Sequence, residues 1–144
     1  MESDFKFSIL FAAIRNVFKK IGDKSLKELD LTSSQMNVLI YIFNNLDSEI
    51  NQKDIEKNLY LKNSTVTDIL NRLESKDFLY RTTSSKDGRY KKILLTDKGE
   101  NIREIIINKA LLFEQYFTKG MSKGESEMLF ELLEKVLKNI SEEA

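Results

Sequence analysis

Residues 64–100 read STVTDILNRLESKDFLYRTTSSKDGRYKKILLTDKGE, and the hydrophobic period changes in the middle of this stretch. In its first part the apolar side chains recur at spacings of three and four residues, which predicts an α-helix over 63–76. The pattern then becomes β-branched, aromatic and partly alternating, which predicts two strands over 78–83 and 89–96. The dipeptide Asp87-Gly88 between them is typical of a hairpin turn. The stretch therefore predicts a helix followed by a two-stranded ribbon.

The helix over 63–76 has an unusual outer face. Its inward face is the apolar set Val66, Ile69, Leu70 and Leu73. A solvated helix face is usually richer in Lys and Glu, and Ser and Thr are mediocre helix formers, so neither solvation nor propensity explains the opposite side. We expect Asn63 or Ser64 to cap the helix at its start. The outer face is short and polar and consists of Ser64, Thr65, Thr67, Asp68, Asn71, Arg72 and Ser75.

Three further helices are expected before this stretch. A stripe of apolar residues predicts a helix over 5–21, and the stripe is wider than one buried face needs, so a second partner surface is implied. Thr32 and Gln35 form a capping box for the next helix. Asn51 is placed to cap a short third helix that ends near Tyr60.

Two helices are expected after the ribbon. Asp97 and Glu100 predict the start of a long helix over about 98–119, with Gly120 as its C-cap. Ser122 with Glu125 predicts the start of the last helix. The fold class is therefore mainly α with a small β-hairpin, that is, α+β.

Composition excludes several classes of function. The chain has 144 residues without Cys, His or Pro, so thiol chemistry and sites built from His or Cys are excluded. Because there is also no Gly-rich phosphate loop and no convergent carboxylate pair, we expect no enzyme, no catalytic residue, no metal and no cofactor. We see neither a signal peptide nor an apolar run of about 18 residues, so we expect a cytoplasmic chain with no membrane partner.

The net charge is zero, but the two signs are unevenly distributed. Residues 62–96 carry eight basic and four acidic side chains, whereas residues 97–144 carry seven basic and ten acidic ones. A basic middle suits a local contact with a polyanion, although an ordinary solvated surface is the alternative interpretation.

The order of elements is that of a winged helix-turn-helix, in which a short helix and a polar-faced helix precede a basic hairpin. The major groove of DNA admits one α-helix, and short polar side chains reach base edges there. A narrow minor groove attracts an inserted Arg. The candidate DNA contacts are Gln52 on the first helix of the motif, Asn63, Ser64, Thr65, Thr67, Asp68, Asn71 and Arg72 on the recognition helix, and Arg81, Lys86, Asp87, Arg89 and Lys91 on the wing. Arg72 has an alternative partner in Glu74, Asp68 or the wing.

The same stretch resembles the MarR family of transcription regulators. The likeness is carried by Arg72-Leu73-Glu74, by Asp87 with Arg89, and by Leu95-Thr96 with Gly99. It implies a homodimer that binds a pseudo-palindromic operator in double-stranded DNA, usually represses transcription, and is often released by a small molecule. A small hydrophobic or phenolic effector is the candidate, and a regulator without an effector is the alternative. The likeness also implies that Arg89 enters the minor groove and that Asp87 orients it.

Two departures from the family pattern bear on the site. Asp77 stands where the family usually has glycine, and Asp can take the left-handed conformation that this position needs. Asp68 stands where relatives often carry a basic residue, so it could accept a hydrogen bond from cytosine N4 instead of touching a phosphate. A winged helix that binds a protein through the same face is the competing function.

The resemblance divides the chain into a DNA-binding lobe over 32–96 and a helical dimerisation lobe over 1–31 and 97–144. The aromatic and aliphatic residues of the second lobe are assigned mostly to core or dimer interface, and a ligand crevice lined by some of the aromatic ones is the alternative. The candidate dimerisation residues are Phe5, Phe7, Leu10, Phe11, Phe117, Leu129, Leu133, Val136, Leu137 and Ile140.

Overall fold

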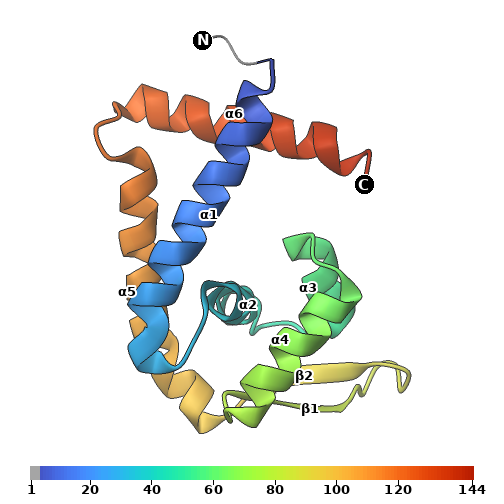
Figure 1. Ribbon diagram of the computed structural model, residues 1–144. Helices are drawn as coiled ribbons and strands as arrows, with labels where there is room; N and C mark the ends of the chain where they lie inside the picture. Colours follow the sequence, from blue (N-terminus) through green and yellow to red (C-terminus); the bar gives the residue numbers. More distant parts are fainter. Residues whose placement is uncertain (1–3) are drawn as a thin grey trace. The chain divides into compact units, whose positions relative to one another are not determined.

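The computed structural model describes residues 4–144, so the first three residues of the expected dimerisation lobe lie outside it. The elements, shown in Figure 1, are α1 (Lys6–Leu26), η1 (Lys27–Leu29), α2 (Ser33–Asn44), α3 (Gln52–Leu59), α4 (Asn63–Ser75), β1 (Leu79–Thr83), β2 (Lys91–Leu95), α5 (Asp97–Thr118) and α6 (Lys123–Ser141). The predicted fold class and order of elements are confirmed. The chain forms two compact units, and the boundary between them falls within α5, after Ile106.

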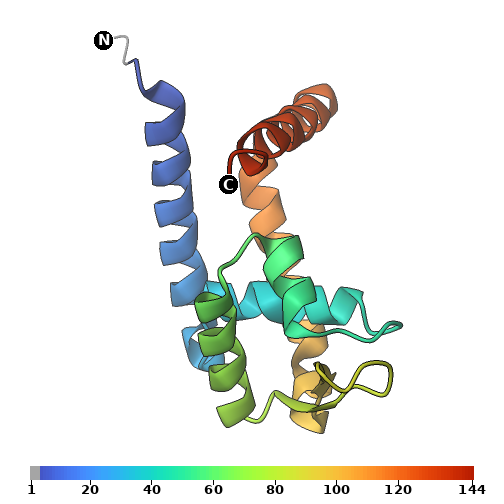
Figure 2. The ribbon, with the colours of Figure 1, turned by 90° about the vertical axis from the view of Figure 1, so that its right-hand side faces the viewer.

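The core of the first unit is the meeting point of α2, α3 and α4. The helix α4 packs on α2 and α3 and leads into β1, and Figure 2 shows these elements from the side. The expected inward face of α4 is buried, and so are two apolar pairs that flank the starts of α2 and α3, Leu31 with Met36 and Ile50 with Ile55. The fully buried side chains include Leu26, Val38, Leu39, Ile42, Ile55, Val66, Leu70 and Leu73.

Three helices begin as the sequence predicts. The side chain of Thr32 accepts a hydrogen bond from the backbone N–H of Gln35, and the side-chain oxygen of Gln35 accepts one from the backbone N–H of Thr32. Asn51 forms the same reciprocal box at the start of α3, with Asp54 as its partner. The predicted box of Ser122 and Glu125 starts α6.

Two predicted caps are wrong. The N-cap of α5 is Thr96 rather than Asp97, because the Thr96 hydroxyl accepts the Gly99 N–H at 3.1 Å. The N-cap of α4 is Lys62, which makes no side-chain capping bond, and Asn63 is already the first helical residue. A Lys side chain has donors but no acceptor, so it cannot bond a free N–H group.

The ends of several elements depend on left-handed residues. Asp30, Tyr60 and Asp77 have φ values of 56°, 54° and 65°, and Gly120 has a φ of 82°. Asp77 thus adopts the conformation that the sequence predicts for it. The helix α1 runs five residues beyond its predicted end, through Leu26, and the turn η1 then leads to Asp30.

The strands β1 and β2 pair antiparallel, with Leu79 opposite Leu95 and Thr83 opposite Lys91. The segment before α3 joins them, because Asn51 forms a bridge with Lys92 and the Ile93 N–H donates to the Ile50 carbonyl at 2.8 Å. The ribbon is therefore fastened to the helices at its stem.

The ribbon tip contains Asp87-Gly88 as the sequence predicts, but it is longer than the stretch 84–88 left between the two predicted strands. The strands end at Thr83 and restart at Lys91, so a longer loop over 84–90 connects them. The Ser84 N–H donates to the Tyr90 carbonyl, and the Tyr90 N–H donates to the Asp87 carbonyl at 3.1 Å. The side chain of Ser84 further accepts the N–H groups of residues 86 and 87.

Gly99 lies in the first turn of α5 and meets the chain just before β1. A Cβ atom built at this position would stand 2.1 Å from the Phe78 carbonyl oxygen and 3.1 Å from a methyl group of Leu95. Because a real Cβ does not approach a backbone atom so closely, glycine is required here on steric grounds.

Apolar side chains remain exposed on α1 in the first unit and on α5 and α6 in the second. No residue of α6, all of which the structure describes, is buried. Of the predicted dimerisation residues, Leu129 and Val136 are half-buried and the others are exposed, from Phe117 at 40% to Phe5 at 70%. A helix with an apolar stripe is stable in water only when that stripe is covered. Among residues 4–144, no helix has both the length and the apolar character needed to cross a membrane.

Candidate nucleic-acid interface

The outer face of α4 is solvent-exposed as the sequence predicts. Asn63, Ser64, Thr65, Asp68, Asn71 and Arg72 are exposed, whereas Thr67 is half-buried at the edge facing α3. The N-cap residue Lys62 provides no side-chain acceptor for the first-turn N–H groups of α4. Such groups favour an anion through their hydrogen atoms and through the helix dipole.

Gln52 fastens α3 to α4. Its side-chain nitrogen donates to the Thr67 hydroxyl at 2.8 Å and to the Asn63 carbonyl at 3.4 Å. Asn63 in turn donates from its side chain to Glu56 at 3.2 Å. These bonds fix the angle between the two helices of the motif, which is a positioning role that the sequence did not indicate for Gln52.

Arg81 joins the ribbon to the same helix. Its NH2 nitrogen donates to Asn71 at 2.7 Å and to Glu74 at 2.8 Å, and its backbone N–H donates to Glu74 at 3.2 Å. The side-chain hydrogen bond from Arg81 lowers the pKa of Glu74. With its side chain only 19% exposed, Arg81 is held against α4 rather than extended into solvent.

At the ribbon tip Arg89 and Asp87 form a bidentate pair. The Arg89 NH2 nitrogen lies 2.7 Å from one Asp87 oxygen, and Nε lies 3.0 Å from the other. Hydrogen bonds from Arg89 lower the pKa of Asp87, and the same contact raises the pKa of Arg89. The Arg89 side chain is 82% exposed, so the carboxylate orients a cation that still faces solvent. Lys86 and Lys91 are exposed as well.

A groove of about 410 Å³ separates the ribbon from α3 and α4. Four cationic side chains contribute to its walls, while its carboxylate, Glu56, already accepts from Asn63 and lies 3.6 Å from Lys53. A positively charged trough of this kind suits a phosphate-bearing strand. The four cations are Lys53, Arg81, Arg89 and Lys91.

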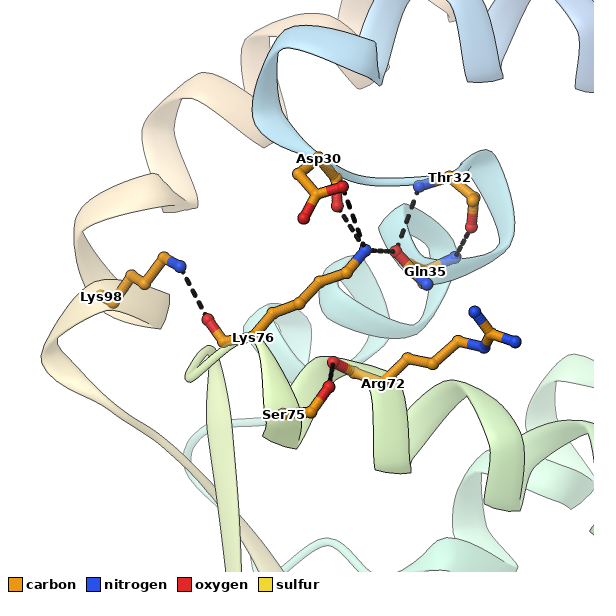
Figure 3. Close-up of polar contacts among 7 residues, drawn as sticks. All are labelled: Asp30, Thr32, Gln35, Arg72, Ser75, Lys76 and Lys98. Atoms are coloured by element: carbon orange, nitrogen blue, oxygen red, sulfur yellow. Dashed lines mark hydrogen bonds and ion pairs between the residues drawn. The ribbon is translucent and has the colours of Figure 1, made fainter.

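The far end of α4 is anchored by Lys76, which Figure 3 shows reaching across to the corner before α2. Its ammonium group donates to the Asp30 carbonyl and, at 3.1 Å, to the side chain of Gln35, which is only 3% exposed. Lys98 donates to the Lys76 carbonyl at 2.7 Å, so α5 is tied to the same point. The anchor fixes the position of α4 within the first unit.

The alternative pairing of Arg72 is resolved in favour of Asp68. The Arg72 Nε lies 3.0 Å from an Asp68 carboxylate oxygen. The pairing follows the helix geometry, because residues four apart lie on one face of a helix whereas residues two apart, such as Arg72 and Glu74, do not.

Two helices fixed at an angle, the second exposing a polar face beside a fastened basic ribbon, define a winged helix-turn-helix protein. The family model for the transcriptional regulator SarA/Rot matches residues 20–106, and the chain belongs to this family.

Relatives agree with this assignment. The HTH-type transcriptional regulator SarZ of Staphylococcus aureus is 35% identical over 95 residues, which are 66% of this chain and 62% of SarZ. The chain thus spans less than two thirds of the length of that curated relative.

Solved structures share the fold over nearly the whole chain. The S. aureus MepR–DNA complex has a TM-score of 0.88 and 29% identity, covering 96% of this chain and 99% of MepR. The transcription regulator MarR from Oenococcus oeni has a TM-score of 0.79 and 32% identity, covering 92% of this chain and 98% of that one. The predicted resemblance to MarR-type regulators is confirmed.

Proposed function

We propose that this protein is a dimeric, sequence-specific regulator of transcription that binds double-stranded DNA. The cationic groove between α3, α4 and the ribbon, next to the exposed polar face of α4, carries the proposal. In this arrangement α4 lies in the major groove of the DNA and Arg89 reaches the neighbouring minor groove. The sugar-phosphate backbone between these two DNA grooves lies along the cationic groove of the protein. The structural relative MepR, whose solved structure is a DNA complex, supports DNA binding.

We assign the individual contacts by the exposure and the bonds of each side chain. Asn63, Ser64, Thr65, Asp68, Asn71 and Arg72 face the major groove, and Lys86 and Lys91 approach phosphates beside Arg89. Gln52, Thr67 and Arg81 lie deeper and act chiefly by holding α3, α4 and the ribbon together, with Asp87 orienting Arg89. Because these roles are binding and positioning roles, we assign the protein no catalytic activity.

The exposed apolar side chains of α1, α5 and α6 support a homodimer. We assign the lobe over 32–96 to DNA binding and the remainder to dimerisation, with the equivalent surface of a second copy covering the apolar stripes. A symmetric dimer reads a pseudo-palindromic operator whose half-sites lie about 10 bp apart. Such a protein acts in the cytoplasm, as a repressor that a small hydrophobic effector releases.

A salt titration of binding tests the proposal. The full-length protein should bind the DNA upstream of its own gene with a steeply negative slope of log affinity against log salt, because each neutralised phosphate releases counterions. Replacing Arg89 by Ala should weaken binding and reduce that slope by about 1.

The matched control is Lys20→Ala, which removes one exposed positive charge from α1. It should leave the slope near the wild-type value if the contact is local. Binding without salt dependence or sequence preference would exclude DNA recognition and would favour a protein-binding winged helix.

A further inference from the structure

The outer face of α4 carries one charged pair among short neutral side chains. Between Asn63 and Ser75, the exposed charged residues are Asp68 and Arg72. They lie one helical turn apart, and the Arg72 Nε donates to an Asp68 oxygen at 3.0 Å. The side chains of Asp68 and Arg72 are 64% and 63% exposed, so the pair lies on the surface of α4 that is assigned to DNA.

Fold stability does not account for this pair. Exposed ion pairs one turn apart contribute little to stability because solvent screens them. A carboxylate on a surface that approaches phosphates is repelled by them, so Asp68 opposes binding unless its charge is used. Its position therefore calls for a role in recognition.

The geometry of Arg72 indicates that role. A guanidinium has five N–H donors in one plane, and the bond to Asp68 uses the one at Nε. The two terminal nitrogens keep a parallel pair of donors. This pair matches O6 and N7 of guanine, which are both acceptors on the major-groove edge. The Asp68 carboxylate fixes the orientation of the guanidinium plane. It also partly neutralises the charge of Arg72, which weakens the attraction between Arg72 and the nearest phosphate.

We propose that Arg72, oriented by Asp68, reads a guanine at one position of each operator half-site. The inference rests on the proposed DNA-binding function and adds a specificity-determining pair to it. In the competing interpretation, Asp68 itself accepts a hydrogen bond from cytosine N4 and reads a base of its own, independently of Arg72. The two interpretations predict different effects of removing the carboxylate.

The experiment selects preferred duplexes from a randomised library with the full-length protein, and then measures binding to every single-base variant of the selected site. Arg72→Lys keeps the charge but removes the fork, so the preference for guanine at one position should fall roughly five- to 150-fold. Asp68→Asn should reduce the preference at that same position while the other positions keep theirs.

Glu131→Gln is the matched control. Glu131 pairs with Lys135 one turn away on α6, with a similarly exposed side chain, and the substitution removes the same charge from outside the recognition helix. It should leave the whole preference profile unchanged.

The outcomes separate the two levels of the proposal. A wild-type protein that selects no sequence would overturn both the function and the inference. If the wild-type protein selects a site and Arg72→Lys keeps the same preference for guanine, the inference alone is overturned. Loss of a cytosine preference at a different position in Asp68→Asn would also overturn it, in favour of independent reading by Asp68.

Discussion

Replacing Gly99 by Ala should destabilise the fold, although Ala is the better helix former. In the first unit this residue brings the start of α5 against the chain just before β1. A Cβ atom at 99 would lie 2.1 Å from the Phe78 carbonyl oxygen, well inside any normal contact. The obstacle is a backbone atom, so a side-chain rotation cannot relieve it.

The magnitude follows from three opposing effects. A glycine-to-alanine change inside a helix stabilises by about 1 kcal/mol. Overpacking a close contact typically destabilises by about 1–3 kcal/mol, and more when backbone must move. The Phe78 carbonyl accepts the Thr96 N–H at 3.2 Å, and displacing it removes a hydrogen bond that contributes roughly 1 kcal/mol. The gain from helix propensity and the lost hydrogen bond nearly cancel, so the expected net loss of unfolding free energy is about 1–3 kcal/mol.

Urea unfolding followed by circular dichroism measures this loss, with all variants at one protein concentration because association changes apparent stability. The control is Gly124→Ala in the first turn of α6, where an added Cβ meets nothing within 4 Å. That variant should match the wild type or gain up to about 1 kcal/mol. A Gly99→Ala protein as stable as the control variant would refute the steric argument.

The remaining predictions concern the end of α4 and can be measured by the same unfolding assay. Asp77→Gly should stabilise by about 1 kcal/mol, because glycine adopts the left-handed conformation without the Cβ penalty, and a loss of stability would contradict this. Lys76→Met should destabilise by about 1–2 kcal/mol, since the Gln35 side chain and the Asp30 carbonyl both lose a donor; an unchanged midpoint would show that the anchor is dispensable. The hydrogen bond from Arg81 lowers the pKa of Glu74 in the folded protein. The contact therefore stabilises the folded state at pH values above 4.5, the ordinary pKa of the carboxyl, and this stabilisation is lost as the pH falls through the lowered pKa. Glu74→Gln should therefore lose less stability on acidification than the wild type, and equal losses in an acid titration would disprove the linkage.

The features that the sequence predicts correctly are those encoded over a few neighbouring residues. The buried face of α4 follows from helical spacing, and the boxes at Thr32 and Ser122 involve residues three apart. The left-handed Asp77 is likewise a local preference. Such signals are readable because the interacting groups are fixed by helix geometry alone.

The sequence does not reveal contacts between segments that are far apart in the chain. It also does not decide which of two neighbouring residues of the same type of chemistry is the helix cap. Gln52 and Thr67 are 15 residues apart, and Lys76 and Asp30 are 46 apart, so only the packed structure brings them together. The cap at Thr96 was missed because the neighbouring Asp97 is an equally good capping residue by type. The second strand begins at Lys91 rather than at the predicted Arg89, and Arg89 is bonded to Asp87 within the loop.

The fastening of β2 to the segment before α3 has a consequence for the energetics of association. A ribbon free to swing would lose backbone conformational entropy on meeting its target, at about 1–2 kcal/mol for each residue ordered. Here the hydrogen bond from the Ile93 N–H to the Ile50 carbonyl orders the base of the ribbon during folding. The loss of conformational entropy therefore occurs on folding and not on binding. In the proposed complex with DNA, α4 and the ribbon are therefore preorganised at a set spacing, and duplexes whose groove geometry does not match that spacing are disfavoured.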